Sequence, residues 1–72
     1  MNKNIQDIGM HKEAGDIYAK WEMFEPAANC YQRINMWEKA GEFFEKANKY
    51  TEAVVAYKNG GFYKKVVDLM QG

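Results

Sequence analysis

Three glutamates, one histidine and one cysteine are the side chains whose type and spacing could support chemistry. Glu38, Glu42 and Glu45 follow one another at i, i+4 and i+7, which places them on one face of a helix. Carboxylates grouped in this way can act as a general acid and base or hold a hard cation. The ordinary role of such a row is a solvated helix face, and we expect these three side chains to be exposed and available to a partner.

His11 and Cys30 do not complete a catalytic or metal-binding set. One His and one Cys are too few ligands for a zinc site, and His11 has no Asp or Ser beside it in a cleft-forming motif that would make it a general base. Cys30 falls among apolar positions, so we expect a small buried hydrophobe rather than a nucleophile. Gly60 and Gly61 lack the Lys-Ser/Thr that follows a phosphate-binding loop. The sequence therefore predicts no catalytic residue, no metal, no cofactor and no enzyme activity.

Composition and charge narrow the class further. The chain has 72 residues, of which 47% are apolar and 15% aromatic, so residues 1–72 are expected to form a single folded segment. Ten basic residues balance ten acidic ones, which argues against nucleic acid as a partner because phosphate binding needs a basic face. The apolar runs are too short for membrane insertion. A single cysteine fits a reducing compartment, and we expect a cytoplasmic protein.

The sequence repeats at every thirteenth residue, in steps that begin at positions 12, 25, 38, 51 and 64. Positions three, six, seven and ten of each step are apolar or small, the spacing of one stripe on an amphipathic helix. No segment alternates with the period of two that a strand requires. Position eleven is the expected turn, because Gly and Asn tolerate the left-handed conformation that ends a helix. The residues at this position are Gly9, Glu22, Asn35, Asn48 and Gly61.

Helices of about ten residues are not stable alone, and short turns fold neighbouring helices into antiparallel hairpins that share a core. We therefore predict an all-α protein, a right-handed α-solenoid of about five short antiparallel helices, with one helix and turn per step and two steps per hairpin. Alanines at position three are expected to let the helices approach closely. The aromatic residues at position seven are expected to fill the core.

Gly15 and Gly41 add a period of two steps, and in this register the sequence resembles the tetratricopeptide repeat (TPR) superfamily. His11 stands where the family usually has Trp, and the hairpin is shorter than the family's hairpin of about 34 residues. The short helices are similar to the TPR-like solenoids of intraflagellar-transport and vesicle-coat subunits. The residues that carry the resemblance are Ala14, Gly15, Tyr18, Ala27, Tyr31, Trp37, Ala40, Gly41, Phe44, Ala53 and Tyr57.

The resemblance implies a non-catalytic protein–protein interaction or scaffold module of a larger cytoplasmic assembly, of ciliary or vesicle-associated type. In a TPR-like register the first helix of each hairpin lines the concave face. Two alternatives remain open: a self-assembling structural solenoid, and an accessory helical region of a nucleic-acid enzyme. The expected partner-binding residues are the exposed charges Lys12, Asp16, Lys20, Glu38, Glu42, Glu45 and Lys46.

The two ends are expected to lack the polar face of a capping repeat, so the chain should belong to a longer solenoid or stack on a second copy. Phe62 and Tyr63 either pack between hairpins or contact a partner. Met10, Met23 and Met36 share one position and either fill gaps beneath the turns, the preferred interpretation, or form an adaptable surface that re-packs around a partner. The expected end-stacking residues are Ile5, Ile8, Val66, Val67, Leu69 and Met70.

Overall fold

A computed structural model describes the backbone of residues 5–71 and the side chains of residues 9–71. Within this range the protein is all-α, with five helices and no strand, as the repeat predicts. Ile5 and Ile8 contribute backbone only, so their predicted role in end stacking lies outside the described side chains. The helices are α1 (Ile5–Lys20), α2 (Phe24–Arg33), α3 (Trp37–Lys46), α4 (Tyr50–Gly60) and α5 (Tyr63–Gln71).

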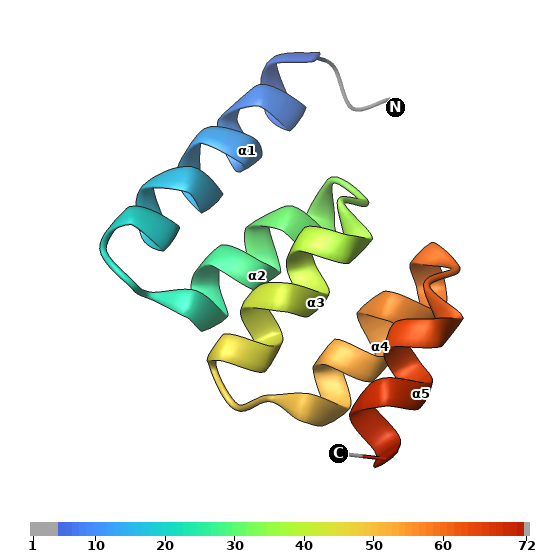
Figure 1. Ribbon diagram of the computed structural model, residues 1–72. Coiled ribbons are helices and arrows are strands. Elements are labelled where there is room, and N and C mark those ends of the chain that lie inside the picture. The colour runs from blue at the N-terminus through green and yellow to red at the C-terminus, as the bar shows by residue number, and fades with distance from the viewer. Residues whose placement is uncertain (1–4, 72) are drawn as a thin grey trace.

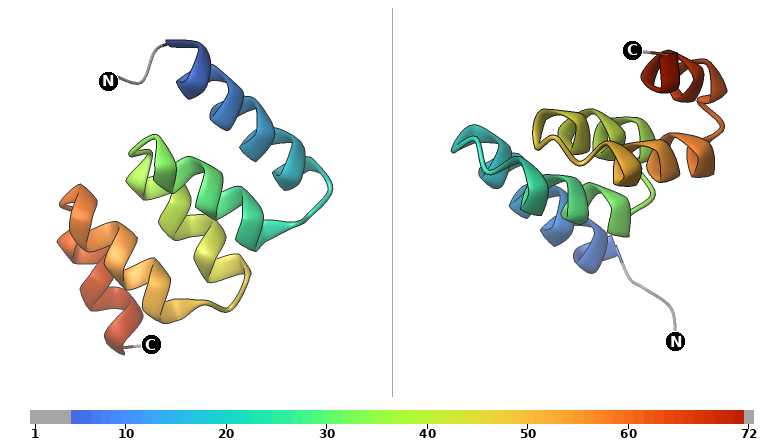
Figure 2. Two further views of the ribbon diagram at one scale, coloured as in Figure 1. Left: turned by 180° about the vertical axis from the view of Figure 1, so that it is seen from behind. Right: turned by 90° about the horizontal axis from the view of Figure 1, so that it is seen from below.

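The five helices follow one another across the molecule in chain order (Figure 1). Each packs against the next, α1 on α2, α2 on α3, α3 on α4 and α4 on α5. The α1–α2 and α3–α4 connections lie at one edge and the other two connections at the opposite edge (Figure 2). The Cα atoms fill a flat volume of 39 × 28 × 13 Å. None of the five described helices is both long and apolar enough to cross a membrane.

All four connections have the same turn geometry. In the first, the N–H of Met23 donates to the carbonyl of Tyr18 at 2.8 Å and that of Glu22 donates to Ala19 at 3.0 Å. These are the two hydrogen bonds of a Schellman motif, which ends a helix through one left-handed residue. Equivalent bonds recur in the other three turns. The left-handed residues are Glu22 (φ 60°), Asn35 (63°), Asn48 (63°) and Gly61 (83°).

The predicted turn position is thus confirmed four times and is wrong for Gly9. This residue lies inside α1, which continues unbroken over 16 residues from Ile5 to Lys20. One glycine weakens a helix by only about 1 kcal/mol relative to alanine, and Met10 to Ala14 after it favour a helix. Gly9 therefore does not separate two helices, and α1 is longer than the repeat predicts.

The core forms from small and aromatic residues, as the repeat positions predict. Tyr31 and Tyr57 are its largest fully buried side chains. The prediction is wrong for Tyr18, whose side chain is 36% exposed, and Cys30 is half-buried rather than buried. The fully or almost fully buried hydrophobic residues are Ala27, Ala28, Tyr31, Ala40, Phe44, Ala53, Ala56 and Tyr57.

The recurrence of glycine at every second step has a direct packing cause. A Cβ atom on Gly15 would lie 2.9 Å from Cε1 of Tyr31, and one on Gly41 would lie 2.7 Å from Cδ1 of Tyr57. Both distances are shorter than any ordinary carbon–carbon contact. Each buried tyrosine ring of α2 and α4 therefore packs directly on the glycine of the helix before it, so the two residue types recur together at one fixed spacing.

We expect opposite effects when two helical glycines are replaced by alanine. Gly41→Ala should reduce the free energy of unfolding by about 1–3 kcal/mol, because the added methyl group forces the buried Tyr57 ring to move. Gly9→Ala should increase it by about 0.5–1 kcal/mol, because the added Cβ meets no described side chain and no neighbouring helix within 4 Å. Urea unfolding followed by circular dichroism measures both. Equal effects at the two positions would contradict the packing of Tyr57 on Gly41.

Candidate protein-binding surface

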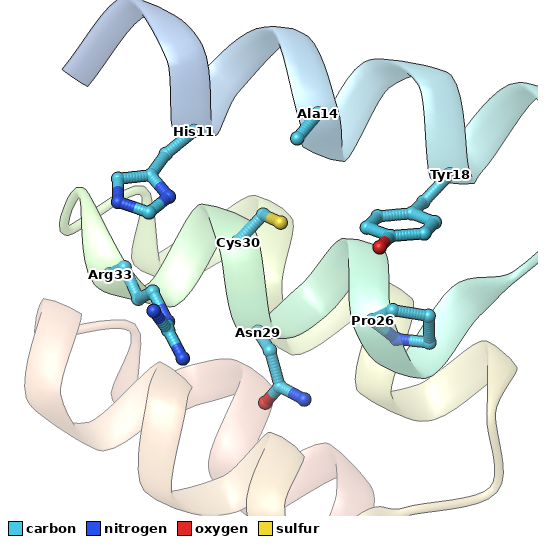
Figure 3. A pocket seen from close by; sticks show the side chains of 7 residues that line it. All are labelled: His11, Ala14, Tyr18, Pro26, Asn29, Cys30 and Arg33. Atoms are coloured by element: carbon cyan, nitrogen blue, oxygen red, sulfur yellow. The ribbon is translucent and has the colours of Figure 1, made fainter. Parts of the chain in front are cut away.

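A shallow groove of about 310 Å³ lies between α1 and α2 (Figure 3). His11 stands over Arg33 at one end and Tyr18 stands over Pro26 at the other, with Cys30 between the two helices. The residues that line the groove are His11, Ala14, Tyr18, Pro26, Asn29, Cys30 and Arg33.

The groove is open because α1 has extensive contacts with only one helix. Two steps further along the repeat, Phe44 occupies the position of Tyr18 and is 2% exposed. Ala56 occupies the position of Cys30 and is 0% exposed. α3, which carries Phe44, packs against both α2 and α4, whereas α1 packs closely against α2 alone. The same repeat positions are therefore core in the second hairpin and surface in the first.

The groove combines apolar surface with hydrogen-bond donors. Tyr18 and Pro26 offer apolar surface with one phenol, whereas His11 and Arg33 bring hydrogen-bond donors to the other end. Among the described side chains, no carboxylate lines the groove to orient His11 as a base. The side chains of residues 9–71 also contain no group of three His, Cys, Asp or Glu that could hold a metal ion.

A stripe of exposed apolar side chains adjoins this groove on α1. Met10 and Ile17 in the helix and Trp21 directly after it are 66%, 51% and 69% exposed, and their spacing places them on one face with Ala14. We call Met10, Ala14, Ile17 and Trp21 the α1 stripe. Large apolar side chains contiguous on a surface mark an interaction site more often than isolated ones do.

The corresponding repeat positions of α3 are covered. Phe43, which corresponds to Ile17, stacks against Tyr31 and Phe24 of α2 with ring centroids 5.5 and 5.9 Å apart. Met36, which corresponds to Met10, also packs against the core. Phe62, which lies just before α5 and occupies the same repeat position, packs against the core as well. The α1 stripe is therefore the one copy of a repeated helix-packing face that no described helix covers.

Several charges predicted to bind a partner are instead engaged within the chain. Asp16 forms an ion pair with Lys12 at 2.9 Å and accepts a hydrogen bond from the buried Tyr31 phenol. The hydrogen bond from Tyr31 holds the pKa of Asp16 below its usual range, and the hydrogen bond from Lys12 adds a smaller effect in the same direction. Lys46 lies over the rings of Phe24 and Phe43 at 5.6 and 5.7 Å. These side chains stabilise helix contacts as well as facing solvent.

The three glutamates at helical spacing do not behave alike. Glu42 is exposed, and Glu38 lies 3.8 Å from Lys65 in a half-exposed ion pair. Glu45 is half-buried and accepts a hydrogen bond from the phenol of Tyr57 at 2.5 Å. The expectation of a fully exposed row is therefore wrong for Glu45, whose carboxylate satisfies a buried tyrosine of the core.

This difference predicts different effects of removing each charge. Glu45→Gln should lower the free energy of unfolding by about 1 kcal/mol, because a neutral acceptor replaces a charged one opposite Tyr57. Glu42→Gln, at an exposed position without such a bond, should stay within about 0.5 kcal/mol of the parent. Chemical denaturation of both variants is the measurement. A Glu42 effect equal to that of Glu45 would refute the assignment.

The C-terminal helix exposes only part of the surface predicted for end stacking. Val66 and Leu69 pack against the core, whereas Val67 and Met70 are 49% and 74% exposed. A second hollow beside α5, lined by Glu45, Lys65, Asp68 and Leu69, is mostly polar. The apolar surface of α5 is therefore smaller than the sequence predicts.

The two aromatic residues after Gly61 have different environments. Phe62 packs inward against the core, as one of the two sequence-based alternatives predicts. Tyr63 is 64% exposed and leaves its ring free to contact a partner. The methionines that share a repeat position differ as well, because Met36 packs against the core while Met10 and Met23 are exposed.

The sequence pattern missed most of the surface just described. Ile17 occupies an apolar repeat position typical of the core, and Pro26, Asn29 and Arg33 carry no motif. One signal was present: α1 is the first helix in the part of the chain that the structure describes, so no described helix precedes it to cover its apolar positions.

Comparison of the sequence with known protein families, with curated proteins and with solved structures found no match.

Proposed function

We propose that this protein is a TPR-like, right-handed α-solenoid segment that acts as a non-catalytic protein–protein interaction module. The uncovered face of its first hairpin, formed by the α1 stripe and the adjoining groove, is the binding surface. The single observation that carries the proposal is the exposure of Met10 and Ile17, next to the exposed Trp21, where the equivalent Met36 and Phe43 pack against the core.

The helix arrangement supports the solenoid part of the proposal. Antiparallel helices that each contact their neighbours, with a glycine–tyrosine contact recurring once per hairpin, are the pattern of stacked helical hairpins. The half-buried free thiol of Cys30 is in keeping with a reducing, cytoplasmic assembly, of the transport or coat type that the sequence resemblance implies.

The geometry also supports a helical ligand. Two later helices of the chain carry a face that corresponds to the α1 stripe. On α3 this face packs against α2, and on α5 it packs against α4. A helix like α2 or α4, with small residues facing the contact and an aromatic at its edge, fits the open position for the same reason. The ligand we propose is therefore an amphipathic helix docked on this face.

A peptide with the sequence of residues 49–61 tests this proposal. The segment contains α4 and no tryptophan, so the fluorescence of the protein reports binding. At a concentration at which the chain is monomeric, we expect a blue shift of the exposed Trp21, because the peptide removes its ring from water. The affinity should be weak, since an isolated short helix must first order.

Two lysine substitutions at exposed apolar positions provide a matched comparison. Ile17→Lys, in the stripe, should weaken peptide binding by at least about tenfold. Val55→Lys, at a 47% exposed position of α4, should leave it unchanged. If the peptide fails to bind, or binds equally well to both variants, the proposed surface is wrong.

A further inference from the structure

We propose that the partner of the α1 stripe is a second copy of this chain, docked as an antiparallel α1–α1 pair with two-fold symmetry. The inference rests on the proposed function, because it names the occupant of the same surface. It differs from end-to-end stacking in that both copies use their first helix and α5 takes no part.

The apolar residues of the stripe match one another when the second α1 runs in the opposite direction. Met10, Ala14, Ile17 and Trp21 have the spacing i, i+4, i+7 and i+11, which is that of a coiled-coil seam. Placing the two-fold axis between Ala14 and Ile17 sets each Ala14 against Ile17 of the other copy. Each Met10 then lies against the Trp21 ring of the other copy, a favourable sulfur–aromatic contact.

The charges beside the stripe are complementary in this arrangement. Glu13 and Lys20 are both exposed and lie on the same flank of the stripe, two helical turns or about 10 Å apart along the helix. Antiparallel pairing brings Glu13 of each copy opposite Lys20 of the other, so the two-fold axis generates two ion pairs. A parallel pair would place Glu13 opposite Tyr18 on the other flank of the second copy, so the Glu13–Lys20 ion pairs would not form.

The contact continues a type of interface that the fold already uses. α3 and α5 each bury this face against the preceding helix, through Phe43 and through Leu69. Lys20 already lies 5.9 Å from the Trp21 ring, so its charge stands at the edge of the stripe. A second α1 therefore meets a surface with an apolar centre and charged margins, the usual anatomy of a small interface.

Sedimentation velocity over a wide concentration range tests the proposal on the whole chain. We expect a reversible monomer–dimer equilibrium. Ile17→Lys should raise the dissociation constant by at least about tenfold, and the matched surface variant Val55→Lys should not change it. Circular dichroism of each variant checks that the fold is retained.

A charge-reversal cycle tests the direction of the pair. Glu13→Lys and Lys20→Glu should each raise the dissociation constant, by about fivefold, because each creates two repulsive pairs. The double variant restores both ion pairs and should recover the parent affinity. Additive losses in the double variant would overturn the antiparallel arrangement.

Two further outcomes separate this inference from the proposed function. A monomer at every concentration that still binds the peptide of residues 49–61 would overturn the dimer and leave a heterologous partner for the surface. A dimer that Met70→Lys abolishes and Ile17→Lys does not would also overturn it, because the contact would then lie on α5. Loss of both dimer and peptide binding would contradict the proposed function itself.

Discussion

Replacing Tyr57 by alanine should unfold the protein at room temperature. The side chain is 0% exposed, packs on Gly41 and donates a hydrogen bond to Glu45, so its removal leaves a cavity and an unpaired carboxylate. Deletion of a buried aromatic side chain costs about 3–5 kcal/mol. A core of this size rarely supplies more than about that total. Tyr31→Ala and Phe44→Ala should act in the same way, for the same reason.

Far-ultraviolet circular dichroism during urea and thermal unfolding measures this effect. Tyr63→Ala is the control, since it removes the same side chain from a position that is 64% exposed. The control should remain within about 0.5 kcal/mol of the parent. A Tyr57→Ala variant that melts like the parent would show that the aromatic side chains of α2 and α4 are not the core.

The protein should also lose stability steeply above about pH 10. Burial, and then the hydrogen bonds to Asp16 and Glu45, raise the pKa of Tyr31 and Tyr57 well above the ordinary value for a phenol. In the unfolded chain both phenols ionise near pH 10, whereas the folded chain keeps their protons. The stabilisation is therefore complete below about pH 10 and is lost as the pH rises above it.

The linkage slope gives the size of the effect. Each retained proton changes the free energy of unfolding by about 1.4 kcal/mol per pH unit, so the two tyrosines together contribute about 3 kcal/mol per unit. Urea unfolding at a series of alkaline pH values measures this slope. Tyr31→Phe and Tyr57→Phe should each remove about half of it. A slope that neither substitution changes would contradict the buried phenols.

The sequence predicted the helices and turns well because both depend on local interactions. The left-handed conformation that ends a short helix depends only on nearby residues. The residue types at position eleven therefore predicted four turns correctly. The pairing of Gly15 with Tyr31 was visible as a period, although its cause, direct ring-on-backbone packing, needed the three-dimensional arrangement.

The candidate surface could not be predicted in the same way, because burial depends on which helix lies alongside. Tyr18 and Phe44 occupy one repeat position, yet one is exposed and the other is buried. Glu42 and Glu45 lie on one helix face, yet only Glu45 reaches a phenol of the next helix. A repeat pattern predicts the same environment for every copy, whereas in the structure the environment of α1, which packs closely against α2 alone, differs from that of α3.

Mapping the bound peptide by NMR tests the central claim most directly. The peptide of residues 49–61 is titrated into the isotope-labelled protein, and the amide shifts are followed residue by residue. We predict that the shifts concentrate on α1 around Met10, Ile17 and Trp21 and on the groove side of α2. Shifts centred instead on α5, or on the charged row around Glu38 and Glu42, would contradict the uncovered first hairpin as the binding surface.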